Sequence, residues 1–206
     1  MKIEIKNATK IIAGNKVLDD ISMTLEGGNI YGFVGHNGSG KTMLLRAISQ
    51  LIRLSSGEIL FSKKCEIGLL IENIGLYSDL NIYENLKLLA KIKNKISKEE
   101  IHQAITLVGL NPDDKRPLKK YSLGMRQRAA LCQAIMETPE ILLLDEPTNS
   151  LDSEGMEIVR QQVKVFKERG AIVILTSHNR EDIKALCDVI FKFENGRVAV
   201  ADKVVF

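Results

Sequence analysis

The spacing of apolar and polar residues divides the chain into strand-like and helix-like segments. Polar and apolar residues alternate in Lys2–Lys6, which predicts an edge strand, and Val17–Leu25 predicts a second strand before a turn at Gly27–Gly28. Continuous apolar runs at Ile141–Leu144 and Ala171–Leu175 are typical of strands buried on both faces of a parallel sheet. The second half of the chain is therefore expected to belong to a parallel α/β core.

The middle of the chain changes to a helical period, from about Gly75 to Tyr121. Ser97 and Glu100 have the spacing of a capping box, so we expect a helix from Ser97 to about Gly109. Further elements are expected at Glu58–Phe61, Glu66–Ile71, Ser153–Arg169 (a helix), and the hairpin strands Asp188–Phe193 and Arg197–Ala201. The pattern predicts one α/β domain, residues 1–206, with a mostly parallel sheet, an N-terminal antiparallel β subdomain and a helical insert at about residues 75–121.

One loop carries the clearest chemical signal. The stretch Gly35–Thr42 fits G-x-x-x-x-G-K-[ST], follows the apolar strand Ile30–Val34 and precedes an amphipathic helix. Its glycines allow successive N–H groups to face a phosphate, and the helix N-terminus adds a positive dipole end. Lys41 is expected to reach the β- and γ-phosphate oxygens, and Thr42 to place its hydroxyl on Mg²⁺. The alternative is a glycine-rich turn with a chance lysine. The residues expected to bind the nucleotide here are Gly35, Asn37, Gly38, Ser39, Gly40, Lys41, Thr42 and Met43.

Two neighbouring acids follow the apolar run Ile141–Leu144. Ligands of α/β proteins bind at the carboxyl ends of the parallel strands, which is where Asp145 and Glu146 leave the sheet. Asp145 is expected to hold Mg²⁺ through water, and Glu146 to orient and deprotonate an attacking water. In the alternative, the Asp-Glu-Pro-Thr stretch merely ends a strand and caps a helix.

Composition argues against several other classes of protein. A net charge of +3 and the absence of tryptophan give no support to a nucleic-acid surface, so no nucleic-acid partner is expected. Cys65, Cys132 and Cys187 lie too far apart for a C-x-x-C metal motif, and they fit a reduced compartment. No apolar run approaches the ~20 residues of a membrane span, and no secretory leader is evident. We expect a cytoplasmic protein whose membrane role comes through a partner.

Five segments carry motifs in a fixed order. They are the phosphate loop, Tyr121–Arg128, Leu144–Thr148, Ser150–Asp152 and His178. Over essentially its whole length the chain resembles the nucleotide-binding subunit of an ATP-binding-cassette (ABC) transporter, with the ABC ATPase fold around a P-loop NTPase core. The resemblance implies ATP and Mg²⁺ as ligands. It also implies a head-to-tail dimer, either a homodimer or a heterodimer with a second ATP-binding subunit.

In such a dimer the phosphate loop of one subunit and the signature residues Ser122 and Gly124 of the other hold each ATP, and His178 contacts the γ-phosphate. Ser122 also stands where an N-cap of the following helix is expected, worth about 1 kcal/mol. Both roles can hold together. Asp152 either caps the next helix or communicates across the dimer, and His178 has the alternative of an ordinary surface histidine.

The chain departs from the family pattern at three places. Glu72 stands where the family usually has glutamine; a carboxylate can still ligate Mg²⁺ but cannot donate a hydrogen bond. The alternative for Glu72 is a solvated loop carboxylate. Leu123 and Met125 replace the common glycine and glutamine of the signature. The aromatic residue that commonly stacks on adenine corresponds to Ile12 or is absent.

A few segments narrow the resemblance. Glu72, Gly75–Tyr77, Asn81–Leu86 and the Tyr121–Met125 signature look like the bacitracin-resistance and lantibiotic-immunity group of bacterial peptide exporters. This implies ATP hydrolysis that drives a separate integral-membrane permease contacted by the helical insert, with the chain peripheral on the inner face of the cell membrane. The alternative function is a soluble ABC-type ATPase acting on ribosomes or DNA. Such proteins normally carry two cassettes or long coiled coils, which this sequence lacks.

Overall fold

The computed structural model describes residues 1–71, 75–93, 95–177 and 180–203. The strands, in chain order, are β1 (Lys2–Ile12), β2 (Asn15–Glu26), β3 (Asn29–Val34), β4 (Ser56–Phe61), β5 (Ile67–Leu70), β6 (Ile141–Leu144), β7 (Ile172–Thr176), β8 (Val189–Glu194) and β9 (Arg197–Lys203). The helices are α1 (Lys41–Ile48), α2 (Ile82–Lys93), α3 (Lys98–Leu107), the short 3₁₀ helix η1 (Leu118–Lys120), α4 (Leu123–Ile135), α5 (Ser153–Glu168) and α6 (Arg180–Leu186).

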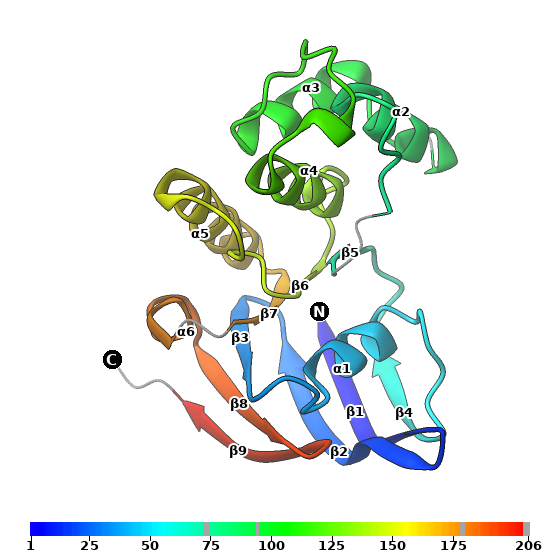
Figure 1. The fold of residues 1–206 in the computed structure, drawn as a ribbon. Coiled ribbons are helices and arrows are strands. Elements are labelled where there is room, and N and C mark those ends of the chain that lie inside the picture. The colour runs from blue at the N-terminus through cyan, green and yellow to red at the C-terminus, as the bar shows by residue number, and fades with distance from the viewer. Residues whose placement is uncertain (72–74, 94, 178–179, 204–206) are drawn as a thin grey trace.

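Two sheets form the framework (Figure 1). The smaller sheet is antiparallel, with strand order β2-β1-β4. The larger has the order β5-β6-β7-β3-β8-β9, and its strands are parallel except for β9, which runs antiparallel to β8. The prediction that Lys2–Lys6 is an edge strand is wrong, because β1 pairs with a strand on each side. The alternation of polar and apolar residues indicates which face of a strand is buried. It does not specify how many neighbouring strands pair with it, because pairing depends on backbone hydrogen bonds.

The larger sheet is buried on both faces, as the apolar runs predict. In β6, Leu142 and Leu144 belong to one hydrophobic cluster, together with residues of α2, α3, α4 and α5. Ile141 and Leu143 point the other way, into a cluster shared with α1 and the antiparallel sheet. The carboxyl ends of the parallel strands carry polar residues such as Asp145 and Thr176, and they form the edge of the sheet on which a site can be built.

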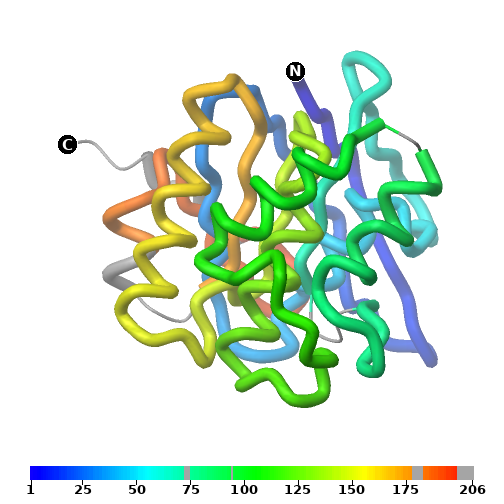
Figure 2. The backbone as a smooth tube through the Cα atoms, turned by 90° about the horizontal axis from the view of Figure 1, so that it is seen from above, coloured from blue at the N-terminus to red at the C-terminus, as the bar shows by residue number. Residues whose placement is uncertain are grey.

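A helical layer covers one face of the larger sheet. Figure 2 shows these helices from above, with α5 at one side and α2 at the other. The predicted capping box at the start of α3 is confirmed, because Ser97 Oγ accepts a hydrogen bond from Glu100 N at 3.2 Å and Glu100 Oε2 accepts one from Ser97 N at 2.7 Å. Within the described ranges no helix is both long and apolar enough to cross a bilayer.

The C-terminal hairpin is confirmed, with β8 and β9 joined by a turn at Asn195–Gly196. Two features of the fold are additions to the predicted pattern. Strands β1 and β2 are longer than predicted and meet in a turn at Ala13–Gly14, where both residues have positive φ. Helix α6 has seven residues, too few to show a helical period in the sequence.

Candidate functional site

The phosphate loop connects β3 to α1. Strand β3 lies between β7 and β8 and ends at Val34, and α1 begins at Lys41. Gly40 has φ 109°, in the left-handed region that favours glycine. A Cβ at this position would lie 2.8 Å from the carbonyl oxygen of Val17 on β2. The glycine therefore lets the loop pass close to the antiparallel sheet.

The N-terminus of α1 offers backbone donors to a ligand. Among the described residues no side chain caps the helix at Gly40, and the N–H groups of a first helical turn have no acceptor within the helix. These groups lie at the positive end of the helix dipole, an environment that favours an anion such as a phosphate.

Lys41 is held inside the loop. Its Nζ donates hydrogen bonds to the carbonyl oxygens of Gly35 at 2.8 Å and His36 at 3.0 Å. Burial lowers the pKa of Lys41, and the carboxylates of Glu146 and Asp145 act in the opposite direction. The ammonium group therefore lies close enough to both carboxylates to interact with them electrostatically.

Thr42 and Asp145 meet across the site and form a connected set of oxygens with Thr176. Thr42 Oγ1 donates to Asp145 Oδ2 at 2.6 Å, and Thr176 Oγ1 donates to Asp145 Oδ1 at 2.7 Å. Mg²⁺ bound with a nucleotide takes one or two protein oxygens besides phosphates and water. A threonine hydroxyl next to a carboxylate is such a donor set, so the residues fit this metal. No group of three or more His, Cys, Asp or Glu side chains suited to a metal occurs in the described part of the chain.

Glu146 has an unusual backbone. Its φ is +48°, which is uncommon for a residue other than glycine. Its N–H donates to Thr176 Oγ1 at 2.9 Å, and Gln127 of α4 approaches its carbonyl oxygen at 3.4 Å through Nε2. Thr176 therefore contacts both acids. It was not among the predicted site residues, although a hydroxyl at the end of the apolar run Ile172–Leu175 was the available signal.

These groups surround a cavity of about 500 Å³. Its lining residues are Val17, Asn37, Gly38, Gly40, Lys41, Thr42, Met43, Asp145, Glu146 and Asn149. The structure thus brings eight predicted residues together. Gly35 and Ser39 lie in the same loop but outside the lining. Ile12 is 43% exposed and is not part of the lining, which contains Val17 and, among the described residues, no aromatic side chain.

Other predicted residues lie elsewhere. Glu72 and His178 fall outside the described residues. Ser122 and Gly124 lie at the start of α4 and do not line the cavity. Ser122 Oγ accepts a hydrogen bond from Met125 N at 3.2 Å, which confirms its role as an N-cap.

The start of α4 lies against the segment that follows Glu146. A Cβ at Gly124 would lie 3.0 Å from the carbonyl oxygen of Ser150. Asp152 caps α5 by accepting a hydrogen bond from Gly155 N at 2.8 Å. The signature segment and the Ser150–Asp152 segment are therefore neighbours within one chain.

A second cavity, the groove, has a volume of about 450 Å³ between β5 and the helices α2 and α4. Its apolar lining includes Leu51, Leu69, Leu89, Ile92, Ala130 and Met136. Ile92 is 77% exposed although it is a large apolar residue. Exposed apolar surface of this kind often marks an interaction site.

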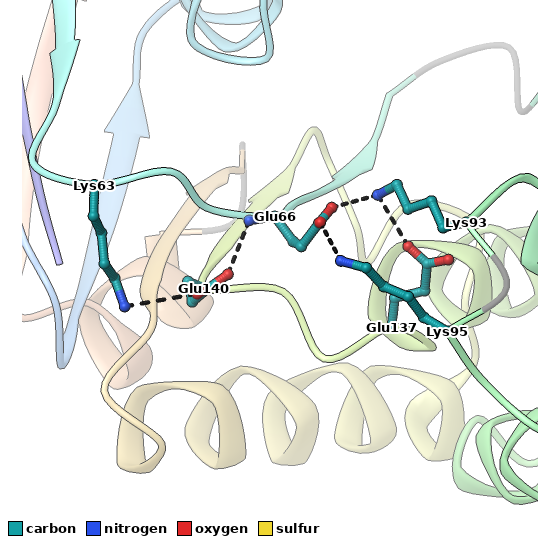
Figure 3. Close-up of polar contacts among 6 residues, drawn as sticks. All are labelled: Lys63, Glu66, Lys93, Lys95, Glu137 and Glu140. Carbon is teal, nitrogen blue, oxygen red and sulfur yellow. Dashed lines mark hydrogen bonds and ion pairs between the residues drawn. The ribbon is translucent and has the colours of Figure 1, made fainter.

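Charged residues connect the elements around the groove (Figure 3). The carboxylate of Glu66 lies between the ammonium groups of Lys93 and Lys95, and Lys93 Nζ also lies 3.1 Å from Glu137 Oε2. Glu66 N donates to Glu140 Oε2 at 2.8 Å. Hydrogen bonds from Lys93 and Lys95 lower the pKa of Glu66 to about 2. This ion network links the start of β5 to the ends of α2 and α4.

A family model described as ABC transporter matches residues 18–149. The matched range covers more than half of the chain and includes the phosphate loop, the signature residues and the Asp145–Glu146 pair. The chain belongs to the ABC transporter family.

Individual relatives support this assignment. The chain is 45% identical to the uncharacterized ABC transporter ATP-binding protein YybJ of Bacillus subtilis (strain 168), with 99% of this chain and 98% of that protein covered. It is 36% identical to the bacitracin transport ATP-binding protein BcrA of Enterococcus faecalis, with 95% and 67% covered. It is 32% identical to the lantibiotic transport ATP-binding protein SrtF of Streptococcus pyogenes, with 95% and 88% covered.

The fold matches a solved cassette. The structure superposes with a TM-score of 0.91, at 22% identity and 99% coverage of both chains, on a dimeric post-hydrolysis state of the ATP-binding cassette MJ0796 bound to ADP and Pi. The predicted ABC ATPase fold, the ATPase class and the resemblance to the bacitracin and lantibiotic group are confirmed. The alternative of a soluble, non-transport ABC-type ATPase is not favoured by these relatives.

Proposed function

We propose that this chain, as one domain of residues 1–206 with a helical insert at about residues 75–121, binds Mg-ATP in the 500 Å³ cavity and hydrolyses it to drive a permease. The observation that carries the proposal is the meeting of Lys41, Thr42, Asp145 and Glu146 in one cavity at the N-terminus of α1. A positive helix end and a lysine suit the phosphates, and the hydroxyl and carboxylate suit the metal.

Each residue has a role that follows from its position. The backbone of Asn37–Met43 holds the phosphates, with Gly35 and Ser39 shaping the loop and Lys41 pairing with the β- and γ-oxygens. Thr42 and Asp145 would hold Mg²⁺, which would supply positive charge to the phosphate oxygens. Glu146 accepts the proton of the attacking water. The Thr176 hydroxyl accepts a hydrogen bond from the backbone N–H of Glu146 and donates one to the carboxylate of Asp145. These two bonds fix the position of the proposed base relative to the proposed metal ligand.

We assign Glu72 and His178 by their positions relative to the family motifs, with Glu72 in place of the usual glutamine. Glu72 would supply a further oxygen to the metal and water, and His178 would contact the γ-phosphate. Ser122 and Gly124 act on the ATP of a second subunit in a head-to-tail dimer, either with a copy of this chain or with another ATP-binding subunit. Their position at the positive end of α4, outside the cavity of their own chain, supports this role.

The membrane partner is a permease that moves a peptide antibiotic or a drug out of the cell. The names of the relatives BcrA and SrtF support this class of cargo. The chain sits on the cytoplasmic face of the membrane, and the groove beside the helical insert receives the permease. Its exposed apolar lining between the sheet and α2 supports this assignment.

Replacing Glu146 by glutamine tests the hydrolytic role. The substitution keeps the shape of the side chain but removes the base, so steady-state ATP turnover should fall about 10²–10⁴-fold while ATP still binds. Glu168→Gln, at the exposed end of α5, is the matched control and should turn over ATP at the wild-type rate. Unchanged turnover in the Glu146→Gln protein contradicts the assignment of the base.

A further inference from the structure

The C-terminal hairpin of β8 and β9 touches the phosphate loop, although it lies beyond the family match at residues 18–149. At the turn of the hairpin, Gly196 N donates a hydrogen bond to the carbonyl oxygen of Ser39 at 3.0 Å. The carbonyl oxygen of Gly196 accepts one from Asp19 N on β2 at 2.8 Å. Gly196 thus bridges the phosphate loop and the antiparallel sheet through its backbone hydrogen bonds.

The backbones meet here at close range. Gly196 has φ +79°, and a Cβ on it would lie 3.1 Å from the carbonyl oxygen of Val17. A Cβ on Gly40 would lie 2.8 Å from the same oxygen and 3.5 Å from Gly196 Cα. A Cβ on Gly35 would lie 2.4 Å from the carbonyl oxygen of Phe193, the penultimate residue of β8. The loop is therefore packed against the hairpin along its length.

An ion pair holds the hairpin in this position. Arg197 donates from Nε to Asp19 Oδ2 at 2.7 Å, and its Nη2 lies 2.6 Å from the same oxygen. Lys16 Nζ lies 2.7 Å from Asp19 Oδ1. The Asp19 side chain is only 12% exposed, so the pair is shielded on the carboxylate side. The guanidinium thus makes one hydrogen bond and one further close contact to the same carboxylate oxygen, and a hydrogen bond between charged groups is stronger than one between neutral groups.

The contact with Ser39 has a consequence for the nucleotide. In a trans peptide the C=O of one residue and the N–H of the next point in opposite directions. Because the Ser39 carbonyl is bonded to Gly196 behind the loop, the N–H of Gly40 is directed away from the hairpin, and Gly40 lines the nucleotide cavity.

We propose that the Asn195–Gly196 turn and the Arg197–Asp19 pair form a clasp that orients the phosphate loop for the nucleotide. Gly196 and Arg197 are positioning residues, which act through Ser39 and Asp19 without touching ATP. The inference rests on the proposed function, since it concerns the affinity of the same cavity. Fixing the loop before binding removes an ordering cost that would otherwise reduce affinity.

Two substitutions, each with a matched control, test the clasp. Gly196→Ala adds a methyl group beside Val17 and strains a left-handed residue. Gly170→Ala is its control, because Gly170 has φ +81° but nothing within 4 Å of a Cβ. Arg197→Gln removes the ion pair with Asp19. Arg116→Gln is its control, because Arg116 makes a similar pair with Asp114 in the helical segment.

The full chain is titrated with Mg-ATP by calorimetry. We expect Gly196→Ala and Arg197→Gln each to raise the Kd by about 10-fold, equivalent to about 1.4 kcal/mol. The KM should rise with it while kcat changes little, and both control variants should match the wild type. Equal affinities in each variant and its control overturn the clasp. If the wild type itself binds no Mg-ATP, the proposed function fails as well. If the wild type binds Mg-ATP but each variant binds as tightly as its control, only the clasp fails.

Amide hydrogen exchange without nucleotide provides a readout independent of activity. Exchange in residues 35–42 should be faster in Arg197→Gln than in Arg116→Gln, because the loop loses its support. Unfolding in urea shows whether each variant and its control are equally stable. If the loop exchanges equally in both variants, the hairpin does not hold it and the clasp is refuted.

Discussion

Thr176 joins the two acids of the site through one hydroxyl group. The hydroxyl donates to Asp145 and accepts from the N–H of Glu146, and the residue is fully buried. The left-handed backbone of Glu146 is maintained next to this hydrogen bond. Strained backbone at such a position points to a functional constraint.

Two substitutions of Thr176 distinguish the effect of its side-chain volume from the effect of its hydroxyl group. Thr176→Val keeps the volume but leaves the Glu146 N–H without this acceptor, so the free energy of unfolding should fall by about 1–3 kcal/mol. ATP turnover should fall by about 10-fold or more, since 1.4 kcal/mol corresponds to a factor of ten in rate. Thr176→Ser should retain most of the stability and most of the ATP turnover of the wild type. Urea unfolding and steady-state ATPase rates check this, and equal behaviour of the valine and serine variants contradicts it.

Among individual residues, the sequence predicted those that belong to a recognisable motif. Lys41, Thr42, Asp145 and Glu146 are recognisable because their spacing follows a strand end or a glycine-rich loop. Thr176 was missed because a hydroxyl after an apolar run also occurs as an ordinary strand end. The contact of Gly196 with Ser39 spans 157 positions, and local patterns carry no information on such a separation.

At the scale of elements, periodicity predicted most of the strands and helices. The apolar runs of β6 and β7 and the capping box of α3 specify their structure locally, and the structure agrees. The central position of β1 was not predictable from its own residues, because strand order depends on which backbones pair. Helix α6 is too short for its period to be read.

The ion network around Glu66 connects β5, α2 and α4, and it gives a prediction on pH. The pKa of Glu66 is lowered to about 2 in the folded protein, so its stabilising effect is present above its ordinary pKa of 4.5 and is lost as the pH falls toward 2. Pairs near the surface contribute about 0–1 kcal/mol each. Glu66→Gln should therefore lower the free energy of unfolding by about 1 kcal/mol at pH 7.

The difference in free energy of unfolding between the Glu66→Gln variant and the wild type should become smaller as the pH falls below 4.5. It should also become smaller in high salt. Urea unfolding from pH 7 to pH 3 measures it. Glu99→Gln, an exposed carboxylate on α3, is the control and should show little difference from wild type at any pH. A Glu66→Gln difference that does not change with pH contradicts the role of the carboxylate charge.

At the scale of the whole molecule, the groove proposed as the permease dock and the nucleotide cavity are lined by different residues. Tyr77 precedes α2 and is 64% exposed, whereas Tyr83 packs edge-on against His102 at 5.0 Å. Tyr77 is therefore the better reporter of permease contact. The family motifs of the sequence indicated the class of partner, but the residues that form each interface could not be predicted from one chain, because an interface needs surfaces from two proteins.

Cross-linking tests the dock. A photoreactive label on a cysteine at Tyr77 should cross-link to an integral-membrane protein in membranes of the source cells. The same label at Lys192, an exposed residue of β8, should give no such product. Mass spectrometry identifies the product. Equal labelling from both positions argues against a localised dock at the helical segment.

The central claim is that two ATP-binding chains enclose ATP between the phosphate loop of one and Ser122 and Gly124 of the other, with Glu146 as the base. Sedimentation equilibrium of the Glu146→Gln protein, with and without Mg-ATP and followed by analysis of the bound nucleotide, tests it most directly. The account predicts a monomer without nucleotide and, with Mg-ATP, a dimer that retains unhydrolysed ATP in each chain. A monomer in saturating Mg-ATP, or conversion of the bound ATP to ADP at the wild-type rate, contradicts it.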